Sequence, residues 1–201
     1  MKTYLIKRIK AFLDWNSIPA VMLEHTPWLT PCNISAAAQL CYDDNALYVR
    51  MCARESPIRA EFTGLLDQPC LDSCLEFFVS PMPDEQRYIN IEYNPNGCLY
   101  LGISTGNHDL YRLIKDNDDT EFLCPKITLT EDGWEITYQI PLKFFRLFFP
   151  AFSFESGKKM RANFYKCGEY TVQRHYLAWN PTTSDTPNFH RPCDFGEIVL
   201  E

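Results

Sequence analysis

The sequence has 201 residues, of which 46% are hydrophobic and 14% aromatic, and its formal net charge is −7. This length and composition suit one folded domain over 1–201 and exclude a disordered chain. The negative charge argues against nucleic acid as a partner, because phosphate binding needs clustered Lys and Arg. We expect no membrane partner either, since no apolar run reaches the length of a span. No signal peptide is recognisable, because basic residues interrupt the stretch after Met1.

The first 31 residues show no clear period, and we predict an irregular segment with one turn around Trp15. In the rest of the chain, alternation of apolar and polar residues predicts a series of short strands. These strands cover 34–42, 46–53, 75–80, 88–94, 98–104, 126–130, 134–140, 161–167, 171–179 and 195–201. A charged, proline-containing loop over 54–70 could hold a short helix within 55–66, and 142–149 is predicted as an amphipathic helix.

Nine to eleven strands with almost no helix indicate an all-β fold, an antiparallel β-sandwich of immunoglobulin or jelly-roll type. We expect less than about 15% helix, well below the usual share in globular proteins.

The hairpin formed by 75–80 and 88–94 gives the most specific prediction. Its apolar residues must share one face, because a shift of one residue would place the whole set in water. This parity puts Glu76 opposite Glu92 and Phe78 opposite Asn90 on the other face. It also puts Ser80 roughly opposite Tyr88. Two carboxylates, an amide and two aromatic rings favour a ligand-facing surface, with a merely solvated sheet face as the alternative.

The nine cysteines are odd in number and lack a CxxC pair or zinc-ligand spacing. Cys41, Cys52, Cys74 and Cys98 lie within predicted strands, where a free cysteine usually behaves as a small buried hydrophobe. We therefore expect free thiols and a cytoplasmic location, with secretion by an unrecognised route as the alternative.

The motifs LDSCLEFFVSP, YINIEYNPNG, GWEITYQIPL, RANFYKCGE and the closing LAWNPTTSDTPNFHRPCDFGEIVL occur in this order from residue 71 onward. This series resembles the family 9 carbohydrate-binding modules and the wider group of DOMON-like β-sandwiches. The resemblance implies a saccharide ligand that is held between two tryptophans and fixed by polar residues of the sheet.

By position, Glu76 matches a family glutamate that hydrogen-bonds the sugar, Asn163 matches a strand asparagine near the site, and Phe189 replaces one of the two tryptophans. Asn90 stands where the family has an arginine, and the second tryptophan position, at 68–70, carries no aromatic residue. The resemblance also implies calcium, for which Asp43-Asp44-Asn45 is the candidate; we expect no other cofactor.

From the resemblance and the strand parity together we predict a shallow saccharide-binding groove on the Glu76 face. The predicted ligand-binding residues are Glu76, Asn90, Glu92, Arg161, Asn163, Trp179 and Phe189.

Two alternatives stay open. Glu76 and Glu92 could act as the carboxylate pair of a glycan-acting enzyme, since opposed carboxylates on neighbouring strands could lie near the ~5–5.5 Å separation that retaining glycosidases use. A DOMON-type haem domain would instead use a Met–His axial pair. The candidates for that pair are Met51 or Met82 with His25, His108, His175 or His190, and no CxxCH attachment motif is present.

Overall fold

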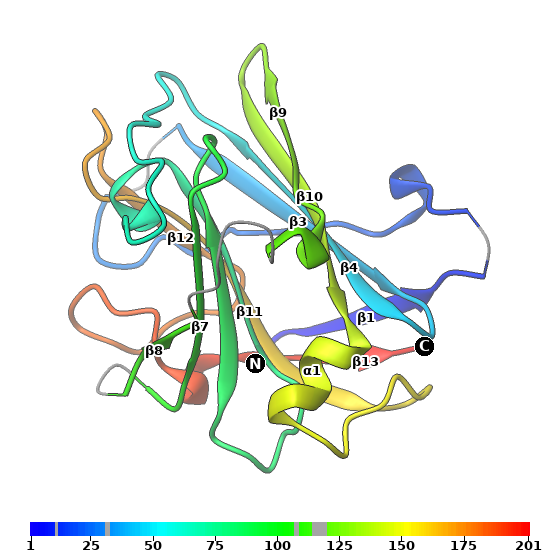
Figure 1. The fold of residues 1–201 in the computed structure, drawn as a ribbon. Coiled ribbons are helices and arrows are strands. Elements are labelled where there is room, and N and C mark those ends of the chain that lie inside the picture. Colours follow the sequence, from blue (N-terminus) through cyan, green and yellow to red (C-terminus); the bar gives the residue numbers. More distant parts are fainter. Residues whose placement is uncertain (11, 31–32, 107–108, 114–119) are drawn as a thin grey trace.

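The structure is a computed structural model that describes the chain except for residues 11, 31–32, 107–108 and 114–119 (Figure 1). The strands are β1 (Thr3–Arg8), β2 (Val21–Met22), β3 (Ser35–Tyr42), β4 (Ala46–Arg54), β5 (Cys74–Ser80), β6 (Tyr88–Tyr93), β7 (Leu99–Ser104), β8 (Tyr111–Arg112), β9 (Lys126–Thr130), β10 (Gly133–Pro141), β11 (Lys159–Gly168), β12 (His175–Ala178) and β13 (Gly196–Leu200). The helices are α1 (Leu142–Phe148) and short 3-10 turns at Trp15–Ser17, Pro69–Leu71, Thr120–Leu123 and Pro192–Asp194.

Strands make up about four tenths of the residues and helices about 10%, so the all-β prediction with little helix is confirmed. Within the described part of the chain, no helix is both long and apolar enough to cross a membrane.

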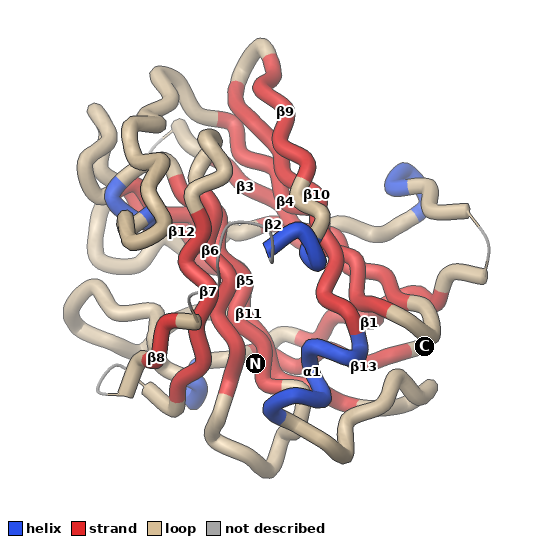
Figure 2. The backbone as a smooth tube through the Cα atoms, viewed as in Figure 1, coloured by secondary structure: helices blue, strands red, loops and turns tan. Residues whose placement is uncertain are grey.

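The strands form two layers that are joined along one side into a single curled sheet (Figure 2). One layer has the order β8-β7-β6-β5-β11-β13, with β12 also paired to β11. The other has the order β3-β4-β10-β9, with β2 also paired to β3. This is the predicted sandwich, and the site described below lies on the outer side of the first layer.

Strand β1 joins the two layers, and the prediction that residues 1–31 are irregular is therefore wrong. Residues Thr3 to Ile6 pair with β13, whereas Lys7 and Arg8 pair with β3, and both pairings are parallel. The two sheets are thus not purely antiparallel. The strand was missed because its partners lie far away in the sequence, so no hairpin turn marks it.

Two smaller predictions also need correction. The segment 55–66 contains no helix: the amides of Glu61 and Phe62 donate to the Asp72 carboxylate instead of to a helical carbonyl. The strand predicted over 171–179 is only His175–Ala178, because the Thr171 hydroxyl bonds the Gly168 carbonyl in a turn that precedes it.

The central hairpin has the predicted register. Glu76 is paired with Glu92 and Phe78 with Asn90 across β5 and β6. The apolar set of the hairpin (Leu75, Phe77, Val79, Ile89 and Ile91) is buried between the layers, at 2% exposure or less. Every residue of β5 and β6 is buried, however, so the second face of the hairpin is covered as well.

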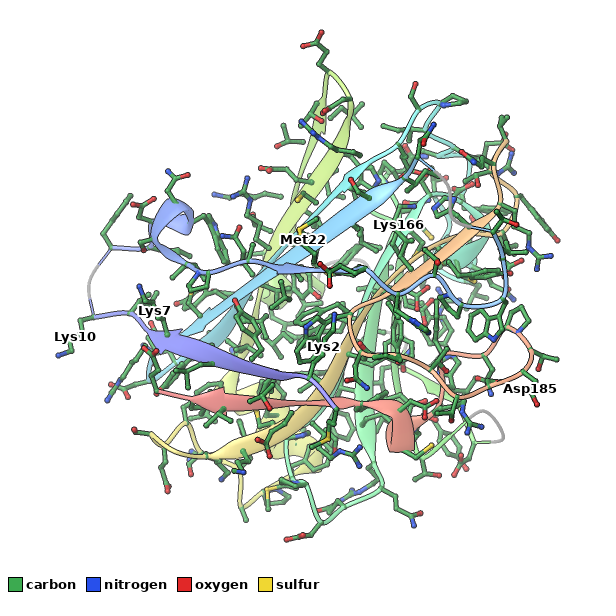
Figure 3. The ribbon with its side chains drawn as sticks, turned by 180° about the vertical axis from the view of Figure 1, so that it is seen from behind. Lys2, Lys7, Lys10, Met22, Lys166 and Asp185 are labelled. Atoms are coloured by element: carbon green, nitrogen blue, oxygen red, sulfur yellow. The ribbon has the colours of Figure 1, made fainter. Side chains whose placement is uncertain are left out.

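A buried polar network lies at one end of the core. The Lys166 ammonium, fully buried, is 3.0 Å from the Glu55 carboxylate and 2.8 Å from His175 Nε2 (Lys166 is labelled in Figure 3). Glu55 also accepts from Trp134 Nε1 at 2.8 Å and from the Ser73 hydroxyl at 3.0 Å. Each charge in the network therefore has a partner, as it must, because burying an unpaired charge away from water is strongly destabilising.

Candidate functional site

The outer face of β5, β6 and β11 carries the polar side chains that strand parity placed there. Glu76 of β5 is paired with Glu92 of β6 on one side and with Tyr165 of β11 on the other. The carboxyls of Glu76 and Glu92 are 3% and 5% exposed, so they lie below the surface of the molecule and not on an open sheet face.

An aromatic cluster covers this face. It consists of Phe78, Tyr88, Tyr165, Tyr176, Phe189 and Phe195 with Cys74, Cys167 and Ala178, and Trp28 packs against it. The ring of Phe189 stacks on Tyr165 with centroids 4.0 Å apart and planes at 16°. The ring centroid of Trp28 lies 5.2 Å from that of Phe189 and 5.1 Å from that of Tyr176. Because these rings bury one another, the face that was predicted to carry a shallow open groove is covered by a second, smaller core.

Hydrogen bonds hold the 180–195 segment that brings Phe189 to this face. Asp194 accepts from the Thr183 amide and from Arg191 Nε, both at 2.9 Å. Burial alone would raise the pKa of Asp194, but these hydrogen bonds lower it below its usual value. Trp28 Nε1 donates to the Ser184 carbonyl at 2.6 Å, so the segments 25–28 and 180–195 form one cover.

A pocket of about 240 Å³ opens between the cover and the sheet. Its lining comprises Trp28, Cys70, Glu76, Glu92, Cys167, Glu169, Tyr176, Pro187, Asn188, Phe189 and His190. Aromatic rings thus form one side of the pocket, and buried carboxyls lie at its base.

Burial sets the protonation of the two carboxyls. It raises the pKa of Glu76 to about 7, although a hydrogen bond from the Cys167 thiol at 2.8 Å lowers it. Burial also raises the pKa of Glu92 well above its usual value, and the charge of Glu76 raises it further. A protonated carboxyl both donates and accepts a hydrogen bond, as does a sugar hydroxyl.

Asn90 lies directly beside these carboxyls and is fully buried. Its amide nitrogen donates to Glu92 at 2.9 Å, and it faces Gly102 of β7, where a Cβ atom would lie only 2.5 Å from Asn90 Oδ1. Asn90 Oδ1 has no hydrogen-bond partner. Asn90 therefore positions Glu92 through this hydrogen bond and is not among the residues that line the pocket.

Three other predicted ligand-binding residues lie elsewhere. Trp179 packs in the core between the layers, against Tyr4 and Phe164, and so points away from the Glu76 face. Asn163 is fully buried and exchanges hydrogen bonds of 2.9 Å with the backbone of Asn180, so it anchors the start of the cover instead of forming the floor of a groove. Strand parity places Asn163 on a face but does not identify what covers that face, whereas Trp179, just after β12, lies on the opposite face of the sheet.

Arg161 lines a neighbouring pocket of about 490 Å³, which shares Asn188 and His190 with the first. Its guanidinium donates to the carbonyls of Cys193 and Phe195, each at 3.1 Å. Of the seven predicted residues, Glu76, Glu92 and Phe189 are the three that line the pocket at the carboxyl pair.

Sequence reasoning missed several pocket residues. Trp28 and Tyr176 supply aromatic surface that the resemblance led us to seek at 68–70, and Cys167 and Glu169 follow Tyr165 on β11 and just beyond it. His190 was named only as a haem ligand; its Nδ1 lies 2.8 Å from the Tyr88 hydroxyl, and burial lowers its pKa to about 4. Trp28 lies in the segment predicted as irregular, where no periodicity marked it.

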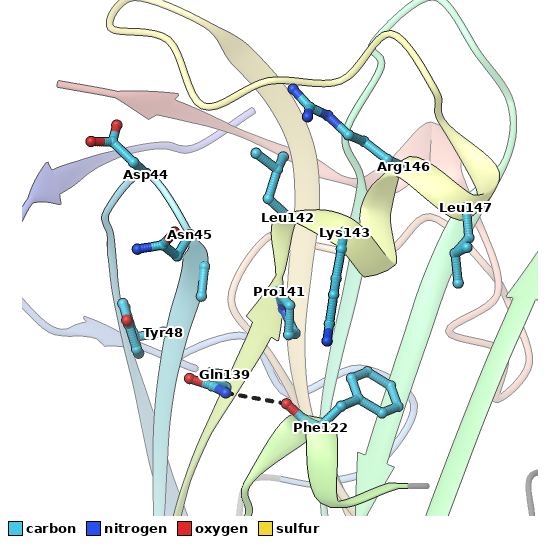
Figure 4. A pocket seen from close by; sticks show the side chains of 11 residues that line it. Asp44, Asn45, Tyr48, Phe122, Gln139, Pro141, Leu142, Lys143, Arg146 and Leu147 are labelled. Atoms are coloured by element: carbon cyan, nitrogen blue, oxygen red, sulfur yellow. Dashed lines mark hydrogen bonds between the residues drawn. The ribbon is translucent and has the colours of Figure 1, made fainter.

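A larger pocket, of about 650 Å³, lies at α1 and the β3–β4 turn (Figure 4). Its charged residues Asp44, Lys143 and Arg146 are exposed, and Gln139 Nε2 is bound to the Phe122 carbonyl, as the dashed line shows. Solvated charges discriminate weakly between ligands because water competes for them. We therefore place the candidate site at the smaller pocket.

The Asp43-Asp44-Asn45 turn does not fit calcium. Asp43 accepts from the amides of Asn45 and Ala46 through one oxygen and from the Tyr48 hydroxyl through the other. Asp44 is paired with Arg8. Calcium needs six to eight oxygen ligands, whereas these carboxylates are already occupied by local donors.

Three of the residues proposed for haem are engaged elsewhere. Met51 is packed in the core between the layers, His175 is bonded to Lys166, and His190 to Tyr88. His108 lies outside the described residues.

Comparisons with known proteins agree with this fold. No curated protein matches the chain. Among solved structures, a candidate carbohydrate-binding protein from Bacteroides uniformis superposes with a TM-score of 0.85 at 26% identity, over 100% of this chain and 99% of the other. Two structures of a carbohydrate-binding module of family 9 from Caldicellulosiruptor kristjanssonii, with cellotriose and with glucose, give TM-scores of 0.71 and 0.72 at 19% and 18% identity.

These two cover 100% of this chain and 94% and 96% of their own, and at such identity they show a shared fold. The family named Carbohydrate-binding family 9 matches residues 7–200, a range that begins within β1 and extends to the end of β13. Because this match spans nearly the whole domain, including every strand that carries the pocket, the chain belongs to carbohydrate-binding family 9.

Proposed function

We propose that the protein is a non-catalytic carbohydrate-binding module that holds one sugar unit in the pocket between Phe189 and the Glu76–Glu92 pair. The observation that carries the proposal is the placement of two buried carboxyls at the base of a pocket with aromatic rings on its side. Aromatic rings pack on the C–H faces of a sugar, and carboxyls bond its hydroxyls.

Glucose or a short β-glucan is the first ligand to test. The family 9 module from Caldicellulosiruptor kristjanssonii was solved with glucose and with cellotriose. The pocket, at about 240 Å³, is smaller than the ~300–1,000 Å³ of pockets for drug-sized ligands, so its size suits a single sugar unit.

Aromatic surface replaces the missing second tryptophan only in part. Trp28 and Phe189 are in contact with each other, so they lie on the same side of the pocket instead of enclosing a ring between them. We therefore expect modest affinity, with a Kd of about 10⁻³ to 10⁻⁵ M, or roughly −4 to −7 kcal/mol.

The test is calorimetric titration with glucose and cellotriose of the wild type, Glu76→Gln and a matched control, Glu197→Gln. Glu197 lies on β13 in an exposed pair with Lys159, so its replacement should leave affinity unchanged. In titrations above pH 7, where Glu76 is ionised, Glu76→Gln should weaken binding by about 10- to 150-fold, because a hydrogen bond to a charged group contributes ~1.5–3 kcal/mol.

Equal affinity of the two variants would place the sugar elsewhere. If Glu76→Gln melts far below the wild type, the carboxyl serves the fold instead of the ligand. Product analysis after long incubation addresses the enzyme alternative: release of shorter sugars that depends on Glu76 and Glu92 would replace the binding module by a glycan-acting enzyme.

A further inference from the structure

Two thiols and a carboxyl converge beneath the pocket. Cys74 of β5 is directly paired with Cys167 of β11, and Glu76 follows two residues later on the same face of β5. The Sγ atoms of Cys74 and Cys167 and a carboxylate oxygen of Glu76 all lie within 4.8 Å of one another. Within the described residues, this is the one group of three or more such side chains that could hold a metal ion.

The cluster is removed from water and lacks a bonded cation. Cys74, Glu76 and Cys167 are 0%, 3% and 2% exposed. Among the described hydrogen bonds, the one that reaches the Glu76 side chain comes from the Cys167 thiol, at 2.8 Å. Lys166, which directly precedes Cys167 on β11, is bound to Glu55 and His175 in the network inside the sandwich. Because a thiol is a weak donor, the Glu76 carboxyl keeps acceptor capacity that an ion could use.

We propose that Cys74, Cys167 and Glu76 form a binding site for a thiophilic divalent cation of the zinc class. Sulfur ligands select zinc over calcium and magnesium, which prefer oxygen. Zn–S bonds of about 2.3 Å and Zn–O bonds of about 2.0–2.2 Å require ligand atoms roughly 3.3–3.8 Å apart in a tetrahedron. The three donor atoms therefore need only small side-chain rotations to enclose the ion.

The fourth coordination position would face the pocket, since Cys167 and Glu76 both line it. Cys70, from the turn Pro69–Leu71, also lines the pocket, and its carbonyl lies 3.5 Å from Cys167 Sγ. Three protein ligands with an open position resemble a zinc site that takes water or an exogenous ligand. On binding, each thiol gives its proton to solvent, and the ion takes the place of those protons.

The site shares Glu76 with the proposed sugar pocket, but its test uses the metal alone and therefore does not depend on sugar affinity. Co²⁺ is added to the reduced full-length protein, and thiolate-to-cobalt charge-transfer absorption is recorded in the near ultraviolet. We expect one equivalent to produce the band. Cys74→Ser and Cys167→Ser should each weaken binding at least tenfold and reduce the band, whereas Cys41→Ser, at a buried free thiol of β3, should behave as the wild type.

A second measurement guards against variants that fail to fold. Zn²⁺ at 100 times its Kd should raise stability by RT ln(1 + [L]/Kd), so the melting temperature of the wild type should increase. Glu76→Gln, which keeps both thiols and a neutral side chain of the same shape, should show a smaller increase. Absence of a charge-transfer band in the wild type, a band that survives in Cys74→Ser/Cys167→Ser, or an equal increase in melting temperature in Cys167→Ser would overturn the proposal.

Discussion

Replacing Phe189 by Ala should weaken both the fold and the binding of sugar. Phe189 is 8% exposed. Its ring stacks on Tyr165 with centroids 4.0 Å apart and packs against Trp28 with centroids 5.2 Å apart. Removal of a buried phenylalanine costs about 3–5 kcal/mol. Because Phe189 lies in a connecting segment that can partly close over the gap, we expect the lower end, about 3 kcal/mol.

Phe189→Leu separates the two contributions. Leucine keeps most of the apolar volume but loses the ring pairs, each worth ~0.5–1.5 kcal/mol, so we expect about 1–2 kcal/mol of lost stability. At temperatures where both variants stay folded, loss of the aromatic surface should reduce sugar affinity by roughly 1–2 kcal/mol, or about 5- to 30-fold.

Urea unfolding measures the loss of stability as a shift of the midpoint concentration, provided that the dependence of the unfolding free energy on urea is unchanged. Calorimetric titration measures the sugar affinity. The control is Phe12→Ala, at a phenylalanine that is 87% exposed, which should change stability by less than about 0.5 kcal/mol. If Phe189→Ala is as stable as Phe12→Ala, the cover does not pack on the sheet as described. If stability falls but affinity is unchanged, Phe189 supports the fold and does not contact the ligand.

Other predictions concern the buried charges and thiols. Lys166→Met should lower the free energy of unfolding in urea by about 3–5 kcal/mol, because it leaves Glu55 buried without its cation. Lys159→Met, at the exposed pair with Glu197, should change stability little. Equal losses in the two variants would contradict the burial of Lys166. The raised pKa of Glu76, about 7, means that the unfolded chain loses this proton from about pH 4.5 while the folded protein keeps it. Stability should therefore fall between about pH 4.5 and 7 by roughly 3 kcal/mol from this group, and Glu76→Gln should lack that part of the slope. The lowered pKa of His190, about 4, acts in the opposite sense, because the unfolded chain binds this proton from about pH 6.5 while the folded protein does not. Stability should therefore fall as the pH decreases from about 6.5 to 4. An unchanged slope of stability against pH in His190→Gln would argue against the burial of His190. Thiol titration of the unfolded protein without reductant should find most of the nine cysteines reactive, and fewer than three would refute the expected reducing location.

The central hairpin could be predicted because its information is local. Period-two alternation fixed the faces of β5 and β6, and the turn between them fixed the register that pairs Glu76 with Glu92. Strand β1 could not be found in this way, although Tyr4 and Ile6 alternate with exposed residues, because its partners β13 and β3 are distant in sequence.

The candidate site was predictable only to the same extent. Glu76 and Glu92 follow from parity, and Phe189 from the family resemblance. What covers a sheet face depends on segments that carry no period, so Trp28 and Tyr176 were missed and Asn163 and Trp179 were misplaced. Asn163 and Trp179 nevertheless hold the start of the segment that delivers Phe189.

The joining role of β1 has a consequence for the order of folding. Tyr4 is paired with Ile198, so this seam between the layers needs both ends of the chain. During synthesis, residues 1–8 must wait until β13 has left the ribosome before that pairing can form. Until then β11 presents an open edge where β13 will dock, and unpaired edges invite association with other chains. Such distant pairing makes folding slow, and we expect a nascent chain that lacks its last strand to be the form most in need of chaperones.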